Sequence, residues 1–217
     1  MSQVGCYTFD AIDNAPSGAG LYAWYYVPTI GRADLEAAVQ ILQGTQGSER
    51  INVARELLVR LVFSELGESP YSVRLEGKLK PLYAGAIGYQ HSFGEADRLI
   101  SEEPDRLVHV VELLRRVVPH FAAPIYIGMT EEMGLRRRLR SHAAKIEELV
   151  EAVARAGGAV DVAEASDNEF ASEVVRRRMN PANLVVHTMT IDVQRKGVAK
   201  TAEAILNRVH YPLCGRR

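Results

Sequence analysis

The stretch PIYIGMTEEMGLRRRLRSH, residues 124–142, is the segment from which we predict the fold. It opens with a short run rich in β-branched and aromatic residues, which favours a strand that includes Tyr126, and a glycine then ends the run. Helical spacing of apolar residues begins at Leu135. Arg138 and His142 are four residues apart in that helix, so they lie one above the other on one face. A phenol, a guanidinium and an imidazole are therefore expected to converge.

Such a cluster has the chemistry to hold a phosphate group. Arginine provides a permanently charged fork that matches phosphate oxygens, and tyrosine and histidine donate or accept protons beside it. A structural explanation also fits, because a Tyr-Ile-Gly triplet occurs by chance and an arginine-rich helix is usually a solvated face. On these residues alone the structural explanation is the stronger one.

A second strand upstream changes this balance. Residues 20–27, GLYAWYYV, are almost continuously apolar and aromatic, as in a strand that is covered on both faces. The order GLY, then YIG, then L-x-x-R-x-x-x-H resembles the GIY-YIG nuclease family. In that family two tyrosines lie on neighbouring strands, an arginine lies on the helix after YIG, and a later helix carries a metal-binding glutamate. The matching residues here are Tyr22, Tyr126, Arg138 and, in the closing segment AEAILNRVHYPL, Glu203.

The resemblance implies a role for each of these residues. Glu203 would hold one divalent ion, Mg²⁺ or Mn²⁺, and a single carboxylate with several water ligands suits Mg²⁺. Tyr22 would be the general base or the phenol that positions the attacking water, with Tyr126 as its partner. Arg138 would stabilise charge on the phosphate, and His142 would pass a proton to or from Tyr22.

Four arginines occur close together at the start of the helix predicted over residues 134–155. A helical wheel places Arg138 beside the apolar stripe, so we expect it to be more buried than the others and to point towards the tyrosines. Arg136, Arg137 and Arg140 point away from the stripe. They are predicted either to contact the nucleic-acid backbone or to serve only as solubilising charges, and the sequence favours neither.

One residue of the family pattern is missing. An asparagine commonly follows the closing proline in that family, but the matching position here is Gly215, which has no side-chain amide. Asn207 lies one turn from Glu203, and we do not expect it to replace that amide. Two readings of the activity therefore stay open: a cleaving nuclease, or a nucleic-acid-binding protein on the same core that does not cut.

The two predicted core strands are separated by residues 28–123, whereas the family usually joins them by a short hairpin. This insertion has helical or strand patterns of its own, at residues 34–42, 51–66, 81–89 and 106–118. We predict an α+β fold, with a small central, mainly antiparallel sheet of about three strands flanked by helices. Residues 1–217 would form one nuclease-like domain, and the insertion would be a mostly helical subdomain between the first two core strands.

Other segments complete this prediction. Residues 1–19 are rich in small and turn-forming residues, and we expect a lead-in arm. Tyr83 competes with Tyr126 for the YIG position, but no L-x-x-R-x-x-x-H follows it, so we favour a core strand with a packed tyrosine. The end of the chain should form a helix, a strand and a helix, over residues 167–179, 183–192 and 200–210. The last helix is expected to pack through Ala202, Ile205, Leu206 and Val209, with Glu203 at the edge of that face.

Composition limits the class of protein. The 217 residues are 47% hydrophobic and 24% charged, as in ordinary globular chains, and the net charge of −1 means that any nucleic-acid site is a local patch. No apolar run approaches the roughly 18 residues that span a bilayer, and no signal-peptide pattern opens the chain, so we expect a cytoplasmic protein. Cys6 and Cys214 lack C-x-x-C spacing and are expected to be free thiols.

The leading functional hypothesis is a metal-dependent endonuclease that hydrolyses phosphodiester bonds of DNA. Within the family, the long insertion before PIYIG and the EA-I-L…YPL ending look most like the type II restriction endonucleases. That likeness implies sequence-specific double-strand cleavage and a homodimer. Repair and phage-defence nucleases share the same core, so the biological role is left open.

Overall fold

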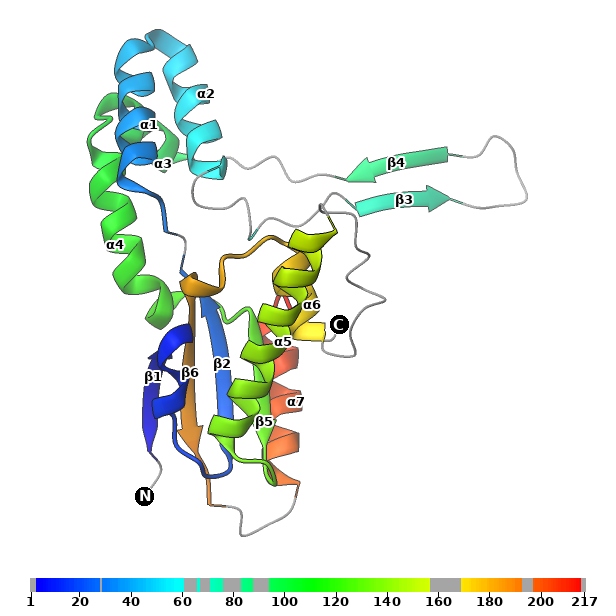
Figure 1. The fold of residues 1–217 in the computed structure, drawn as a ribbon. Helices are drawn as coiled ribbons and strands as arrows, with labels where there is room; N and C mark the ends of the chain where they lie inside the picture. The colour runs from blue at the N-terminus through cyan, green and yellow to red at the C-terminus, as the bar shows by residue number, and fades with distance from the viewer. Residues whose placement is uncertain are drawn as a thin grey trace. The chain divides into compact units, whose positions relative to one another are not determined.

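The computed structural model describes residues 3–27, 29–60, 66, 71–75, 83–87, 94–156, 169–192 and 197–215. Within these ranges the fold is α+β (Figure 1). The chain divides into two compact units, which we call the sheet unit (residues 1–29 and 113–217) and the inserted unit (residues 30–112).

A four-stranded antiparallel sheet forms the centre of the sheet unit, in the order β1-β6-β2-β5. Its strands are β1 (Val4–Thr8), β2 (Gly20–Tyr26), β5 (Tyr126–Thr130) and β6 (Leu184–Thr190). The sequence predicted that the GLY and YIG strands are neighbours, and the pairing of β2 with β5 confirms this. Segments on either side of the long insertion therefore lie side by side.

Two features of the predicted sheet were wrong. It has four strands rather than about three, because residues expected in a lead-in arm form β1, an edge strand that pairs with β6. Since β1 and β2 are joined by the short 3₁₀ helix η1 (Phe9–Asn14), the helical stretch follows β2 and does not separate the first two strands of the sheet. The alternate side chains of β1 are exposed or only half-buried, so this edge strand gives little apolar signal in the sequence.

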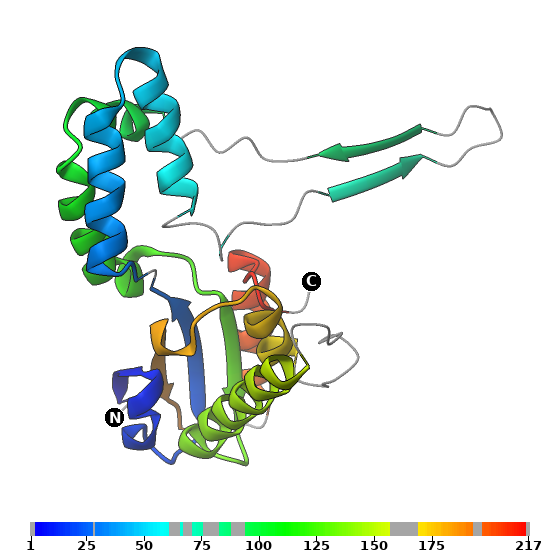
Figure 2. The same ribbon diagram turned by 45° about the horizontal axis from the view of Figure 1, so that its top comes forward.

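Helices flank the sheet, and their positions can be followed in Figures 1 and 2. They are α5 (Leu135–Arg155), α6 (Glu169–Arg176), the short η3 (Pro181–Asn183) and α7 (Val198–His210). In both views α5 crosses one face of the sheet, and α7 packs along the edge strand β5. Helices α5, α6 and α7 fall where helices were predicted, although the expected start of α6 at residue 167 lies outside the described residues, and η3 was not predicted.

The core of the sheet unit lies between the sheet and α5. Leu135, Leu139 and Ile146 repeat at helical spacing and are fully buried, and each such side chain contributes about 1.5–3 kcal/mol by leaving water. Trp24 is also fully buried and stacks on Phe170 of α6 with ring centroids 5.5 Å apart. The ring of Phe170, from a distant part of the chain, therefore covers Trp24 on this face of β2.

The inserted unit contains helices and a separate antiparallel pair of strands. Its elements are α1 (Arg32–Gly44), α2 (Gly47–Leu58), β3 (Tyr71–Leu75), β4 (Tyr83–Ile87), α3 (Glu95–Glu102) and the start of α4 (Arg106–Phe121). A buried carboxylate joins two of the helices, because Arg55 Nε donates to Asp97 Oδ2 at 2.9 Å. The predicted helices at 34–42 and 106–118 are confirmed, while parts of the segments predicted at 51–66 and 81–89 lie outside the described residues.

Two further expectations concern the whole chain. None of the helices in the described ranges is long and apolar enough to cross a membrane. Both cysteines are free, as predicted, with Cys6 exposed and Cys214 buried.

Candidate functional site

The candidate site begins where β2 and β5 pair. Tyr22 and Tyr126 lie on the same face of these strands, with ring centroids 6.1 Å apart. Tyr22 is directly opposite Gly128, and a Cβ atom built on that glycine would lie 2.5 Å from the Tyr22 ring and hydroxyl. The glycine of YIG therefore leaves the space that the phenol of the neighbouring strand occupies.

Helix α5 brings a guanidinium and an imidazole to Tyr22. The start of the helix is fixed because the Leu135 backbone N–H donates to the Gly18 carbonyl at 2.9 Å. Tyr22 Oη lies 2.8 Å from Nε2 of the buried His142, and Arg138 Nε donates to the same phenol oxygen at 3.3 Å. Because arginine is only a donor, the hydrogen of the phenol is available to His142 Nε2.

Burial dominates the ionisation of the two phenols. It raises the pKa of Tyr22 far above its usual range, and Tyr126 raises that pKa further, whereas Arg138 lowers it by less. Burial also raises the pKa of Tyr126, Arg138 opposes this, and the Glu203 carboxylate adds to it. Both phenols are therefore protonated at neutral pH.

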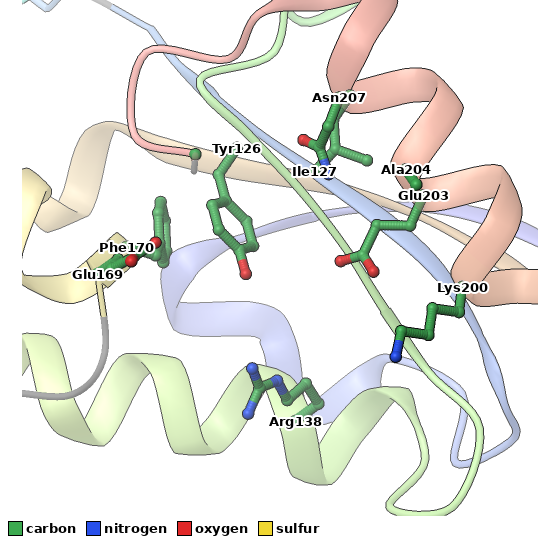
Figure 3. Close-up of a pocket in the computed structure, with 10 residues that line it drawn as sticks. Tyr126, Ile127, Arg138, Glu169, Phe170, Lys200, Glu203, Ala204 and Asn207 are labelled. Atoms are coloured by element: carbon green, nitrogen blue, oxygen red, sulfur yellow. The ribbon is translucent and has the colours of Figure 1, made fainter. Parts of the chain in front are cut away.

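A cavity of about 590 Å³ lies beside this cluster. It is lined by Tyr126, Ile127, Arg138, Glu169, Phe170, Lys200, Glu203, Ala204, Asn207 and Gly215. Figure 3 shows the Glu203 carboxylate reaching from α7 towards Tyr126, with Arg138 on the α5 side. Tyr22 does not line the cavity and is only 2% exposed, so Tyr126 is the phenol that faces the open space.

Helix α7 is held at both ends, which fixes Glu203. Before its first turn, the Gly197 backbone N–H donates to Glu131 Oε1 at 3.2 Å. Beyond its last turn, the Cys214 N–H donates to the Ile125 carbonyl at 2.7 Å, next to β5. Two segments that flank the Tyr126 strand therefore position the carboxylate.

The predicted packing face of this last helix was wrong in part. Ile205 and Val209 are 59% and 66% exposed, whereas Ala199 is buried and Leu206 is half-buried. The face of α7 that meets the sheet is thus rotated towards Glu203, which is itself half-buried. An apolar pattern identifies an amphipathic helix, but here the cavity replaces apolar packing on part of the buried side.

The burial of the arginines of α5 differs in part from the prediction. Arg137 and Arg140 are exposed and Arg138 is half-buried, as expected, but Arg136 is half-buried too. Arg136 Nε donates to the Ala15 carbonyl at 2.8 Å, and Arg140 Nε pairs with Asp13 at 2.5 Å. Two of the three predicted nucleic-acid contacts therefore also bind the segment that precedes β2, and their role towards nucleic acid stays a prediction.

Sequence reasoning missed several residues of the cavity. Phe170 is fully buried, and its ring centroid lies 4.8 Å from that of Tyr126 and 5.3 Å from that of His142, so it supports both. No local pattern connects it to the motif. Lys200 was identifiable in principle, because a position three before Glu203 shares its side of a helix. Asn207 was considered from the sequence, but it was not expected to replace the missing amide.

The donors around the cavity determine which ions could bind. In the part of the chain that the structure describes, no three His, Cys, Asp or Glu side chains gather as a metal-binding group. The cavity offers oxygen instead, from the carboxylates of Glu203 and Glu169 and from the Asn207 amide. The buried Oδ1 of that amide accepts no hydrogen bond from the described residues. Oxygen donors without thiolate or imidazole fit Mg²⁺ or Mn²⁺.

No family model matches the sequence, and the searches of curated proteins and of solved structures gave no match either.

Proposed function

We propose that this chain is a metal-dependent endonuclease of the GIY-YIG type, and that it hydrolyses phosphodiester bonds of DNA. The observation that carries the proposal is the convergence of motif residues from separate segments on one cavity and the cluster behind it. They are Tyr22, Tyr126, Arg138, His142 and Glu203. The order of the motifs and their placement agree with what a nuclease of this type requires.

Glu203 would hold the divalent ion, with Asn207 beside it. When bound, Mg²⁺ or Mn²⁺ supplies positive charge next to the phosphate and makes a bound water more acidic. Arg138 lines the same cavity and is oriented by the Tyr22 oxygen, so its charge faces the place where a phosphate would lie. Lys200 lines the cavity near Glu203 and adds a second cation there.

The buried cluster suits proton removal from the attacking water. As the water oxygen bonds to phosphorus and the bond to the departing sugar oxygen breaks, one proton of the water must leave. We assign Tyr126 as the phenol beside that water, Tyr22 as the link behind it, and His142 Nε2 as the final acceptor. Each phenol takes one proton as it passes its own hydrogen on, so neither has to ionise first. The departing oxygen takes its proton from solvent.

This assignment exchanges the roles that the resemblance implied for the two tyrosines. Tyr22 is nearly inaccessible and contacts His142 directly, whereas Tyr126 lines the cavity. The raised pKa of Tyr22, caused mainly by burial, also argues against a free phenolate at neutral pH. A hydrogen-bonded relay works with protonated phenols.

A plasmid-cleavage assay tests the proposal. Supercoiled DNA is incubated with Mg²⁺ or Mn²⁺ and the wild type, Glu203→Gln, Arg138→Ala or the control Tyr211→Phe, which alters a side chain that is 72% exposed and outside the proposed site. We expect cleavage to fall by orders of magnitude in the first two variants only, with Arg138→Ala keeping its DNA affinity and Glu203→Gln its stability within about 1 kcal/mol. Equal cleavage by wild type and Glu203→Gln would rule out this site.

The finer role follows from the resemblance alone. We propose restriction-type cleavage of both strands by a homodimer, for which discrete fragments of plasmid DNA are the test. Random fragments would instead favour a repair or phage-defence role.

A second candidate function is DNA binding without cleavage. Gly215 favours it, because this position lines the cavity and offers no amide where the family commonly has asparagine. If this second function is correct, the wild type should bind DNA without cleaving it in Mg²⁺ or Mn²⁺, and Glu203→Gln should bind DNA as the wild type does.

A further inference from the structure

The side-chain oxygen of Asn207 is unusual among the polar atoms of the cavity wall. Oδ1 is shielded from solvent, and no residue that the structure describes donates a hydrogen bond to it. A buried carbonyl oxygen without a donor opposes folding, so such an atom in a cavity wall points to a partner that binds there.

Helix geometry connects this amide with the candidate metal carboxylate. Asn207 is four residues after Glu203, so both side chains lie on one face of α7. Both line the cavity, and Figure 3 shows them extending from α7 on the side of Tyr126. The amide is thus placed next to whatever the carboxylate binds.

The residue next to Asn207 in the cavity wall is a glycine, which places no side chain of its own beside the amide. Gly215 lines the same cavity, and a Cβ atom built on it would lie 3.6 Å from Asn207 Oδ1. A longer side chain at position 215 would therefore compete for the space beside the amide. Among the lining residues that the structure describes, only Asn207 of α7 then supplies a side-chain amide.

We propose that Asn207 is a positioning residue for the divalent ion, and that its amide oxygen accepts a hydrogen bond from a water of the ion's hydration shell. This inference rests on the proposed function, in which Glu203 holds the ion. Mg²⁺ gives up its water reluctantly and is commonly held through it, so acceptors around those waters determine how firmly the ion is bound. Because Oδ1 is shielded in this structure, the proposal requires the amide to rotate about χ2 so that Oδ1 faces the cavity. This proposal departs from the expectation that Asn207 does not replace the amide missing at Gly215.

Calorimetric titration of the full chain with Mn²⁺, without DNA, tests this role. The proteins are wild type, Asn207→Ala, Asn207→Asp, Glu203→Gln and Thr201→Ala, the last being an exposed polar residue of the same helix. Asn207→Ala should weaken Mn²⁺ binding by ten- to a hundredfold, since it removes the acceptor. Asn207→Asp keeps an acceptor oxygen and should bind at least as well as wild type, and Thr201→Ala should not change the affinity.

Two outcomes would overturn the inference in distinguishable ways. If Asn207→Ala binds Mn²⁺ as wild type does while Glu203→Gln does not, Asn207 has no part in holding the ion and the proposed function stands. If wild type binds no Mn²⁺, or Glu203→Gln binds it equally well, the metal site itself is wrong and both proposals fall. Loss of binding in Asn207→Ala that Asn207→Asp does not restore would show general damage to α7 and would also overturn the inference.

Discussion

Tyr22→Phe should destabilise the sheet unit by about 2 kcal/mol. The phenol is 2% exposed, and its hydroxyl meets His142 Nε2 at 2.8 Å and Arg138 Nε at 3.3 Å. Phenylalanine keeps the ring, so no large cavity forms and the loss is mainly that of the hydroxyl. Since His142 is only 1% exposed, its nitrogen loses this partner in a place that water hardly reaches, and such a loss costs about 1–3 kcal/mol.

Urea unfolding followed by tryptophan fluorescence measures this effect. Trp24 is the single tryptophan of the chain, is fully buried and belongs to the sheet unit, so its emission reports that unit and not the inserted one. The matched control is Tyr211→Phe, because Tyr211 is 72% exposed and its substitution should change the free energy of unfolding by less than about 0.5 kcal/mol.

A double-mutant cycle with His142→Gln identifies the contact responsible. If the Tyr22 hydroxyl stabilises the fold through His142, the double variant should lose less than the sum of the single losses, by about 1 kcal/mol or more. The reasoning is refuted if Tyr22→Phe is no more harmful than Tyr211→Phe, or if the two losses simply add.

Two further predictions use the same fluorescence assay. Gly128→Ala should lower the free energy of unfolding by about 1–3 kcal/mol, because the new methyl would lie 2.5 Å from the Tyr22 hydroxyl. The control Gly18→Ala should be tolerated, because the nearest atom to its methyl would be 3.9 Å away. Equal losses of stability in the two variants would contradict the close approach of Tyr22 to Gly128. For Cys214, burial raises the thiol pKa from 9.0 to about 12. The buried neutral thiol therefore contributes fully to the free energy of unfolding below pH 9. Above pH 9 this contribution falls by about 1.4 kcal/mol per pH unit, because the thiol ionises in the unfolded chain first. The stability advantage of wild type over Cys214→Ala should therefore shrink between pH 8 and pH 10, and a constant difference would contradict the prediction.

Local sequence patterns predicted the elements that position the motif. The aromatic run of β2, the YIG strand and the helical spacing after Leu135 depend on neighbours in the chain, and all three elements occur. The convergence of Arg138 and His142 on Tyr22 follows from two regular periods, that of a strand and that of a helix. A wrong register in either element would have separated these side chains.

Contacts between distant segments were not predictable in this way. Arg136 is half-buried because a carbonyl before β2 lies within reach of its guanidinium, and Phe170 supports Tyr126 from a helix far along the chain. Nothing in the residues next to either one indicates such a partner. Helix α7 shows a related limit, since an apolar stripe that included Ile205 and Val209 did not reveal which side of the helix meets the sheet.

The two halves of the candidate site differ in what holds them together. The Tyr22 and His142 pair lies in the core and finds its hydrogen bond within the fold, so it forms when the chain folds and contributes to stability. Asn207 Oδ1, on the α7 side, finds no donor among the described residues, so that half is completed only by what binds. Substitutions in the first half should therefore change the free energy of unfolding whether or not metal is present. Substitutions at Asn207 should change ion affinity without lowering the metal-free stability, because they remove no hydrogen bond that the described fold makes to Oδ1. This contrast distinguishes a residue that serves a binding site from one that serves the fold.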